Sequence, residues 1–210
     1  MYRDTETQNE PFSFVNDTLV ELTELQVCDI LVKPNHNLLY GTSFVTGGNG
    51  FGHAMLVIKG AEGKNALDVL QKAEVFESIA KKLPGEYQLR KSPGFFYSDD
   101  PKLSNTTLGE QNAGYRYRLR LPLTEAQKDS IISFVLRQDA DLSGWRSQKT
   151  FQPGDNKKIW YCSLLIWEAF YSVLGIDIDS NGGLMVYPND LISSNYFEND
   201  DTGNKKRVRF

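Results

Sequence analysis

The sequence predicts an α+β fold in which antiparallel strands pack against one buried helix. Residues 53–58 are apolar over the length of a strand, and residues 115–121 alternate between aliphatic or aromatic and basic side chains. Residues 162–174 form a longer segment that is apolar almost all round, which is typical of a helix at the centre of a core. A chain of 210 residues, 40% of them hydrophobic, can bury such a helix without disulfides.

The first half of the chain predicts several short strands. Residues 29–32 are apolar and end at the turn signal Lys33-Pro34-Asn35. Residues 47–52 contain four glycines and predict a flexible loop. We expect residues 53–58 and 66–71 to pair as an antiparallel hairpin, because turn residues lie between them.

The second half predicts two helices. Residues 84–114 are rich in Pro, Gly, Ser and Asn, which favours a surface excursion with one short strand. The capping-box sequence Thr124-Glu125-Ala126-Gln127 predicts a helix over residues 125–138. Gly175 is the expected stop of the apolar helix 162–174.

The composition of the chain argues against nucleic acid and membranes as binding partners. The formal charge of −4 gives no basic surface for nucleic acid, and no apolar run is long enough to span a membrane. The basic cluster at residues 205–209 is interpreted as a solvated, frayed tail. We expect one domain over residues 1–210, with a core at about residues 28–194 and polar ends at 1–12 and 199–210.

Cys162 is the strongest candidate for a nucleophile. A cysteine in the first turn of a helix meets unpaired N–H groups and a partial positive charge, which favour the thiolate. His53 begins a strand beside the glycine-rich loop and is the better candidate base, whereas His36 lies in a polar loop. The alternative for Cys162 is a small buried hydrophobic residue with no chemical role.

A catalytic histidine needs a third group that orients its ring. In the expected hairpin Asp68 lies on the strand beside His53, between apolar neighbours. Such an acid is either exposed at a sheet edge or orients the imidazole, and the residues alone leave both open. Two cysteines and two histidines are too few for an ordinary structural zinc site, and we expect no cofactor.

Four ordered motifs resemble the circularly permuted NlpC-type papain-like cysteine hydrolases of the YiiX/YaeF-like kind. The motifs are Asp29-Ile30-Leu31-Val32, Gly52-His53-Ala54-Met55-Leu56-Val57-Ile58, Trp160-Tyr161-Cys162-Ser163-Leu164-Leu165-Ile166-Trp167 and Pro188-Asn189-Asp190-Leu191-Ile192-Ser193-Ser194. In that group histidine precedes cysteine, as here. Family members often carry glycine before the first motif and serine or threonine before the histidine, where this chain has Cys28 and Gly52.

The resemblance implies a permuted papain-like fold, with a central antiparallel sheet packed against the helix that carries the cysteine. It implies that Cys162 is the nucleophile, His53 the general base and Asp68 the third residue. Tyr161 and Tyr40 are candidates for a second oxyanion donor or a substrate contact, with a core or rim tyrosine as the alternative. Phe51 is a candidate substrate contact, with a strand core as the alternative.

These residues predict a cysteine amidohydrolase or endopeptidase with a Cys-His-Asp triad. The resemblance suggests amide bonds of bacterial cell-wall peptide as substrate. The N-terminal residues 1–10 lack the features of a signal peptide, so we expect synthesis in the cytoplasm and delivery as an antibacterial effector, with secretion machinery and an immunity protein as partners. The alternatives are a lipid-directed acyltransferase or thioesterase that uses the same thiol, and a non-catalytic binding module.

Residues 177–182 also fit the first half of a calcium loop, with Asp177, Asp179 and Asn181 at positions one, three and five. Position twelve, where a bidentate glutamate belongs, is Pro188. The sequence therefore favours a polar turn over a calcium site.

Overall fold

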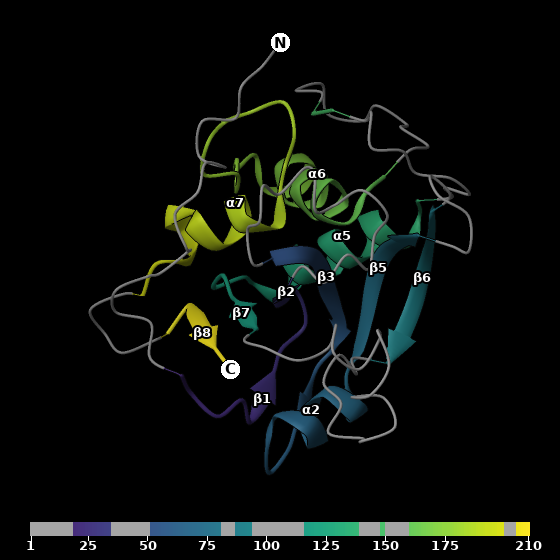
Figure 1. Cartoon of the computed structure of the whole chain (residues 1–210). Helices are drawn as coiled ribbons and strands as arrows, with labels where there is room; N and C mark the ends of the chain where they lie inside the picture. The colour runs from purple at the N-terminus through teal and green to yellow at the C-terminus, as the bar shows by residue number, and fades with distance from the viewer. Residues whose placement is uncertain are drawn as a thin grey trace.

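A six-stranded antiparallel sheet is the largest element of the computed structural model (Figure 1), which describes residues 19–34, 51–80, 87–93, 116–138, 148–149, 160–199 and 205–210. The strand order is β6-β5-β3-β2-β7-β8. The bounds are β2 (Ile30–Pro34), β3 (Phe51–Lys59), β5 (Glu74–Ala80), β6 (Tyr87–Pro93), β7 (Tyr117–Leu119) and β8 (Arg207–Arg209). A separate pair is formed by β1 (Glu24–Leu25) and β4 (Ala61–Glu62).

Helices cover the sheet on two sides. Figure 1 shows three of them gathered at one side of the molecule, with α2 and β1 at the other. The bounds are α2 (Ala66–Lys72), α5 (Glu125–Leu136), α6 (Cys162–Leu174), α7 (Pro188–Ser193) and the short 3-10 helix η2 (Asn195–Phe197). The α+β class is therefore confirmed. Among the described helices, none combines the length and the apolar character needed to cross a bilayer.

Alternation along the strands divides the core into two parts. Side chains such as Ile30 and Leu56 pack with α5, α6 and α7. Their neighbours in sequence, such as Leu31 and Met55, pack with α2 and the segment around Leu22. This division follows from the two-residue repeat of a strand, which sends successive side chains to opposite faces.

The two long helices are confirmed. All of residues 162–170 in α6 are buried, as expected of a helix that is apolar all round, and Gly175 ends it with φ +69°. In α5 the Thr124 hydroxyl accepts a hydrogen bond from the N–H of Gln127, and the Gln127 side chain accepts one from the N–H of Thr124. The capping box fixes the start of α5 at the predicted residue.

The expected strand at residues 66–71 is wrong, because these residues form α2. The Asn65 side chain caps α2 by accepting a hydrogen bond from the N–H of Asp68 at 2.9 Å. Asp68 and Lys72 then pair one turn apart on its exposed side. The cap signal Asn65-Ala66-Leu67-Asp68 is local, and it outweighs the weak strand-like alternation of so short a segment.

The antiparallel partner of β3 is β5 instead, with Leu56 opposite Phe76. Strand β3 begins at Phe51, inside the segment expected to be a loop, and β2 continues through the expected turn to Pro34. Residues 87–93 form β6, the short strand expected within 84–114. The remainder of the range 84–114 lies outside the described residues. Residues 1–18 and residues 35–50, which include His36, also lie outside them.

The expected frayed C-terminal tail is also wrong. Residues 207–209 form β8, which pairs with β7 over Tyr117–Leu119, a shorter strand than the predicted 115–121. Val208 is buried, and Leu22 and Leu25 are buried at the other end of the chain. The core thus extends beyond residues 28–194 on both sides.

Cys28 takes a backbone conformation that favours glycine. Its φ of +70° lies in the left-handed region, and its N–H donates to the carbonyl of Val57 at 2.9 Å. This turn delivers the chain into β2. A non-glycine residue in this region costs about 1–2 kcal/mol.

We expect Cys28→Gly to be more stable than Cys28→Ala by about 1 kcal/mol, because both lose the thiol but only glycine removes the backbone strain. At ordinary strand or helix positions the alanine variant is the more stable of the two. Chemical denaturation of both variants measures the difference. Equal stabilities, or a more stable alanine variant, would contradict the assigned strain.

Candidate active site

His53 is held by a buried carboxylate. It is the third residue of β3, and its Nε2 lies 2.7 Å from Oε2 of Glu77 on the neighbouring strand β5. The two side chains are 1% and 0% exposed. Because Nε2 faces the carboxylate, Nδ1 is the ring nitrogen left for a reactant, and it has no hydrogen-bond partner among the described residues.

Cys162 is the first residue of α6, as the sequence predicts. The charge of the His53 imidazole and the backbone N–H of Ala54 both act on its sulfur and favour the thiolate. The Ser163 hydroxyl is 3.9 Å from the sulfur. Donors and a helix N-terminus around one sulfur favour its negatively charged form.

The pKa values of the pair shift in opposite directions. Burial raises the pKa of the Cys162 thiol, but the charge of the His53 imidazole, and after it the polar groups of His53 and the Ala54 N–H, lower that pKa by more. The pKa of Cys162 therefore ends below its ordinary value. Burial lowers the pKa of His53, but Cys162 and then Glu77 outweigh burial and raise it to about 9. Between the lowered pKa of Cys162 and the raised pKa of His53, the arrangement favours a thiolate beside an imidazolium.

Three hydrogen bonds fix the start of α6 around the cysteine. The Ser78 hydroxyl on β5 donates to the carbonyl of Trp160 at 2.8 Å. The Ser163 hydroxyl donates to the carbonyl of Val186 at 2.7 Å, and the N–H of Val186 donates to the Tyr161 hydroxyl at 2.8 Å. These bonds tie the residues on both sides of Cys162 to neighbouring elements, which limits movement of the sulfur.

The predicted role of Asp68 is wrong. Asp68 lies on α2, where its carboxylate binds Lys72 Nζ at 2.9 Å and accepts from the backbone N–H of Lys64. Glu77 occupies the orienting place instead. Sequence reasoning missed it, although Glu77 is an acid inside the strand-like run Val75-Phe76-Glu77-Ser78-Ile79, next along the chain after the capped helix.

The other predicted contacts have different outcomes. Tyr161 is buried, and its hydroxyl accepts from Val186, so it supports the cysteine helix. Phe51 begins β3, and its side chain lies outside the described residues, as does Tyr40. Gly52, which precedes the histidine, is part of β3.

A lysine lies where the calcium-like loop would hold a cation. Lys149 is buried and pairs with both Asp177 and Asp179. Asp179 and Asn181 instead accept backbone N–H groups two residues ahead, at Asn181 and Gly183, as in polar turns. In the part of the chain that the structure describes, no three His, Cys, Asp or Glu side chains are placed to hold a metal ion.

The comparisons leave the family of the chain unassigned. No family model matches the sequence. A stretch of 35 residues is 66% identical to the uncharacterized protein YycO of Bacillus subtilis strain 168, and it covers 17% of this chain and 14% of YycO. The fold is similar to the crystal structure of the metalloprotein yiiX from Escherichia coli O157:H7, with a TM-score of 0.44 and 12% identity over 81% of this chain and 93% of that one.

We expect Cys162 to react with iodoacetamide at lower pH and faster than Cys28. The two cysteines are 4% and 3% exposed, so access is matched, but burial raises the pKa of Cys28 to about 12 while the pKa of Cys162 is lowered. Peptide mapping of the alkylated protein between about pH 5 and pH 9 separates the two thiols. Equal rates at both would leave Cys162 as an ordinary core thiol.

Glu77→Gln should raise the pH at which Cys162 becomes alkylated. Removing the carboxylate charge lowers the pKa of His53, and a neutral imidazole no longer stabilises the thiolate. Asp68→Ala is the matched control, since it removes an acid that pairs only on the surface of α2. A shift in Asp68→Ala with none in Glu77→Gln would reverse the two assignments.

Proposed function

We propose that this chain is a cysteine hydrolase that cleaves amide bonds through Cys162, His53 and Glu77. The observation that carries the proposal is the buried series of contacts from carboxylate to imidazole to sulfur at the N-terminus of α6. A nucleophile, a base and an orienting group in this order are the parts of a catalytic triad. Papain-like enzymes with permuted chain order, which the four sequence motifs resemble, combine the same parts.

In the proposed reaction the Cys162 thiolate attacks the carbonyl carbon of the substrate. The oxyanion that forms lies against the first N–H groups of α6, which have no acceptor within the helix. His53 donates its Nδ1 proton to the leaving amine, the C–N bond breaks, and a thioester remains on Cys162. Water then attacks the thioester, returns a proton to Nδ1 and releases the acid and the thiolate.

Glu77 does not exchange protons in this scheme. Its carboxylate accepts a hydrogen bond from the Nε2–H of His53, and this bond directs Nδ1 toward the sulfur. The carboxylate also stabilises the imidazolium. We further propose peptide amides of the bacterial cell wall as the substrate class, on the strength of the motif resemblance. The compartment in which the protein acts follows from that substrate, which lies outside the inner membrane.

We expect Cys162→Ala and His53→Ala each to reduce turnover by about a thousandfold or more, because nucleophile and base act as one unit. Mass spectrometry of purified cell-wall peptide after incubation measures it, with products that differ from the substrate by one water. Cys28→Ala, which removes the other buried cysteine, is the matched control. Full activity in folded Cys162→Ala would contradict the proposal.

Expression in bacteria tests the substrate class separately. We expect the protein to be tolerated in the cytoplasm and to lyse cells when a signal peptide directs it to the periplasm, and Cys162→Ala should remove the effect. Toxicity confined to the cytoplasm, dependent on Cys162, would contradict a cell-wall substrate and favour acyl transfer or thioester hydrolysis by the same thiol.

A further inference from the structure

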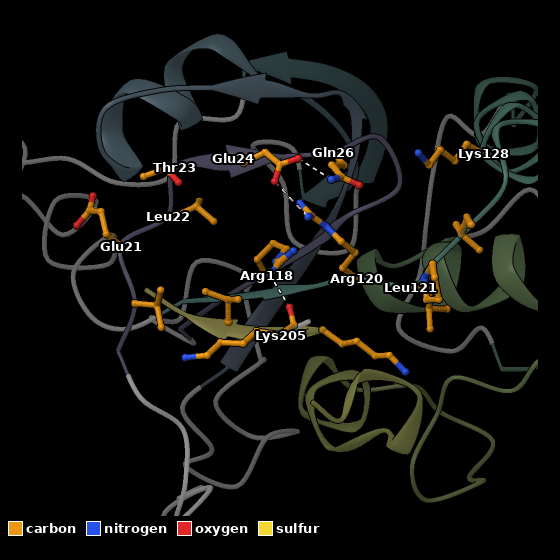
Figure 2. Close-up of a pocket in the computed structure, with 15 residues that line it drawn as sticks. Glu21, Leu22, Thr23, Glu24, Gln26, Arg118, Arg120, Leu121, Lys128 and Lys205 are labelled. Atoms are coloured by element: carbon orange, nitrogen blue, oxygen red, sulfur yellow. Dashed lines mark hydrogen bonds and ion pairs between the residues drawn. The ribbon is translucent and has the colours of Figure 1, made fainter. Parts of the chain in front are cut away.

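A pocket is lined by residues outside the candidate active site. It has a volume of about 460 Å³ and is bounded by the segment before β2, the turn after β7 and the chain entering β8 (Figure 2). None of its lining residues is Cys162, His53 or Glu77. Its walls carry five basic and two acidic side chains: Arg118, Arg120, Lys128, Lys205, Lys206, Glu21 and Glu24.

Arg118 is the unusual residue of this pocket. It lies on β7 and is only 6% exposed, yet it forms no ion pair with any described carboxylate. One guanidinium nitrogen, Nη2, donates to the backbone carbonyl of Lys205 at 2.7 Å, and the buried Nε has no partner. A buried cation with an unused N–H carries a desolvation cost that an anion would offset.

The nearest carboxylates are already engaged. Asp29 binds Arg120 through both of its oxygens at 2.7 Å, and Glu24 contacts Arg120 at 3.4 Å and accepts from Gln26 at 2.5 Å. Figure 2 shows Arg120 beside Arg118 and turned toward Glu24, with the backbone carbonyl of Lys205 next to Arg118. Arg120 therefore holds the direct ion pairs, whereas Asp29 and Glu24 act on Arg118 only through their charge.

The remaining charged side chains leave an excess of positive charge. Lys128 pairs with Glu125, and Glu21 accepts the backbone N–H of Ala66. In the described part of the chain, Lys205 and Lys206 form no ion pair through their side chains. Arg118, Lys205 and Lys206 thus line the same pocket, with no ion pair to a carboxylate for any of them among the described residues, and Leu121 and Leu123 add an apolar surface.

We propose that this pocket binds a small organic phosphate monoester, with its phosphate on Arg118, Lys205 and Lys206 and its apolar part against Leu121 and Leu123. A dianion with three free oxygens matches three cationic donors better than a carboxylate, which has two oxygens and one charge. The volume exceeds that of a phosphate group alone, which leaves room for the organic part. The site is independent of the cysteine chemistry.

Phenyl phosphate is the probe, and calorimetric titration with thermal unfolding measures its binding to the full chain. We expect it to bind the wild type and raise its Tm. Lys205→Gln/Lys206→Gln, which changes two side chains without ion pairs, should weaken binding about tenfold or more. Lys64→Gln, an exposed lysine outside the pocket, is the matched control and should bind like the wild type.

Arg118→Met provides a second test. It should abolish binding and, without ligand, unfold at a Tm no lower than the wild type, because it removes a buried guanidinium that forms no direct ion pair. The proposal is overturned if the double lysine variant binds phenyl phosphate as tightly as the wild type. It is also overturned if the wild type does not bind at about 10 mM, or if benzoate binds equally well.

Discussion

The buried bond between His53 and Glu77 is the interaction on which the candidate site depends. It selects Nε2 as the nitrogen that faces the carboxylate and leaves Nδ1 for the sulfur. Together with Cys162, whose effect is larger, Glu77 also offsets the burial of the imidazole, which alone would lower its pKa. Without Glu77, the Cys162 sulfur would be the remaining group among these causes that raises the pKa of His53 against burial.

The sheet and α6 bring these groups together from distant parts of the sequence. Strands β3 and β5 are adjacent, so His53 and Glu77 share a short hydrogen bond across 24 residues of chain. Helix α6 begins beside β3, where the Ala54 N–H reaches the Cys162 sulfur. The bonds of Ser78 and Ser163 to neighbouring carbonyls hold this beginning in place, so that the relative position of Cys162 and His53 is set by the packed core.

What the sequence predicted correctly was locally encoded. The capping box of α5 and the apolar run of α6 ending at Gly175 carry their signals within a few residues. Pairing between distant segments has no such local signal. Strand β8 pairs with β7 across about ninety residues of chain, and the basic sequence of β8 taken alone predicts a solvated tail. Misassigning the short α2 as a strand placed Asp68 beside His53 and hid Glu77 on the following strand.

Nitrogen-15 NMR of the histidine rings tests the central claim most directly, since the chain has only two histidines. At about pH 7.5, above the ordinary histidine pKa of about 6.5, the account predicts that His53 carries protons on both ring nitrogens, and that its pKa falls in Cys162→Ala and in Glu77→Gln. A neutral His53 ring in the wild type at that pH, with the same titration in both variants, would contradict a thiolate–imidazolium pair held by Glu77.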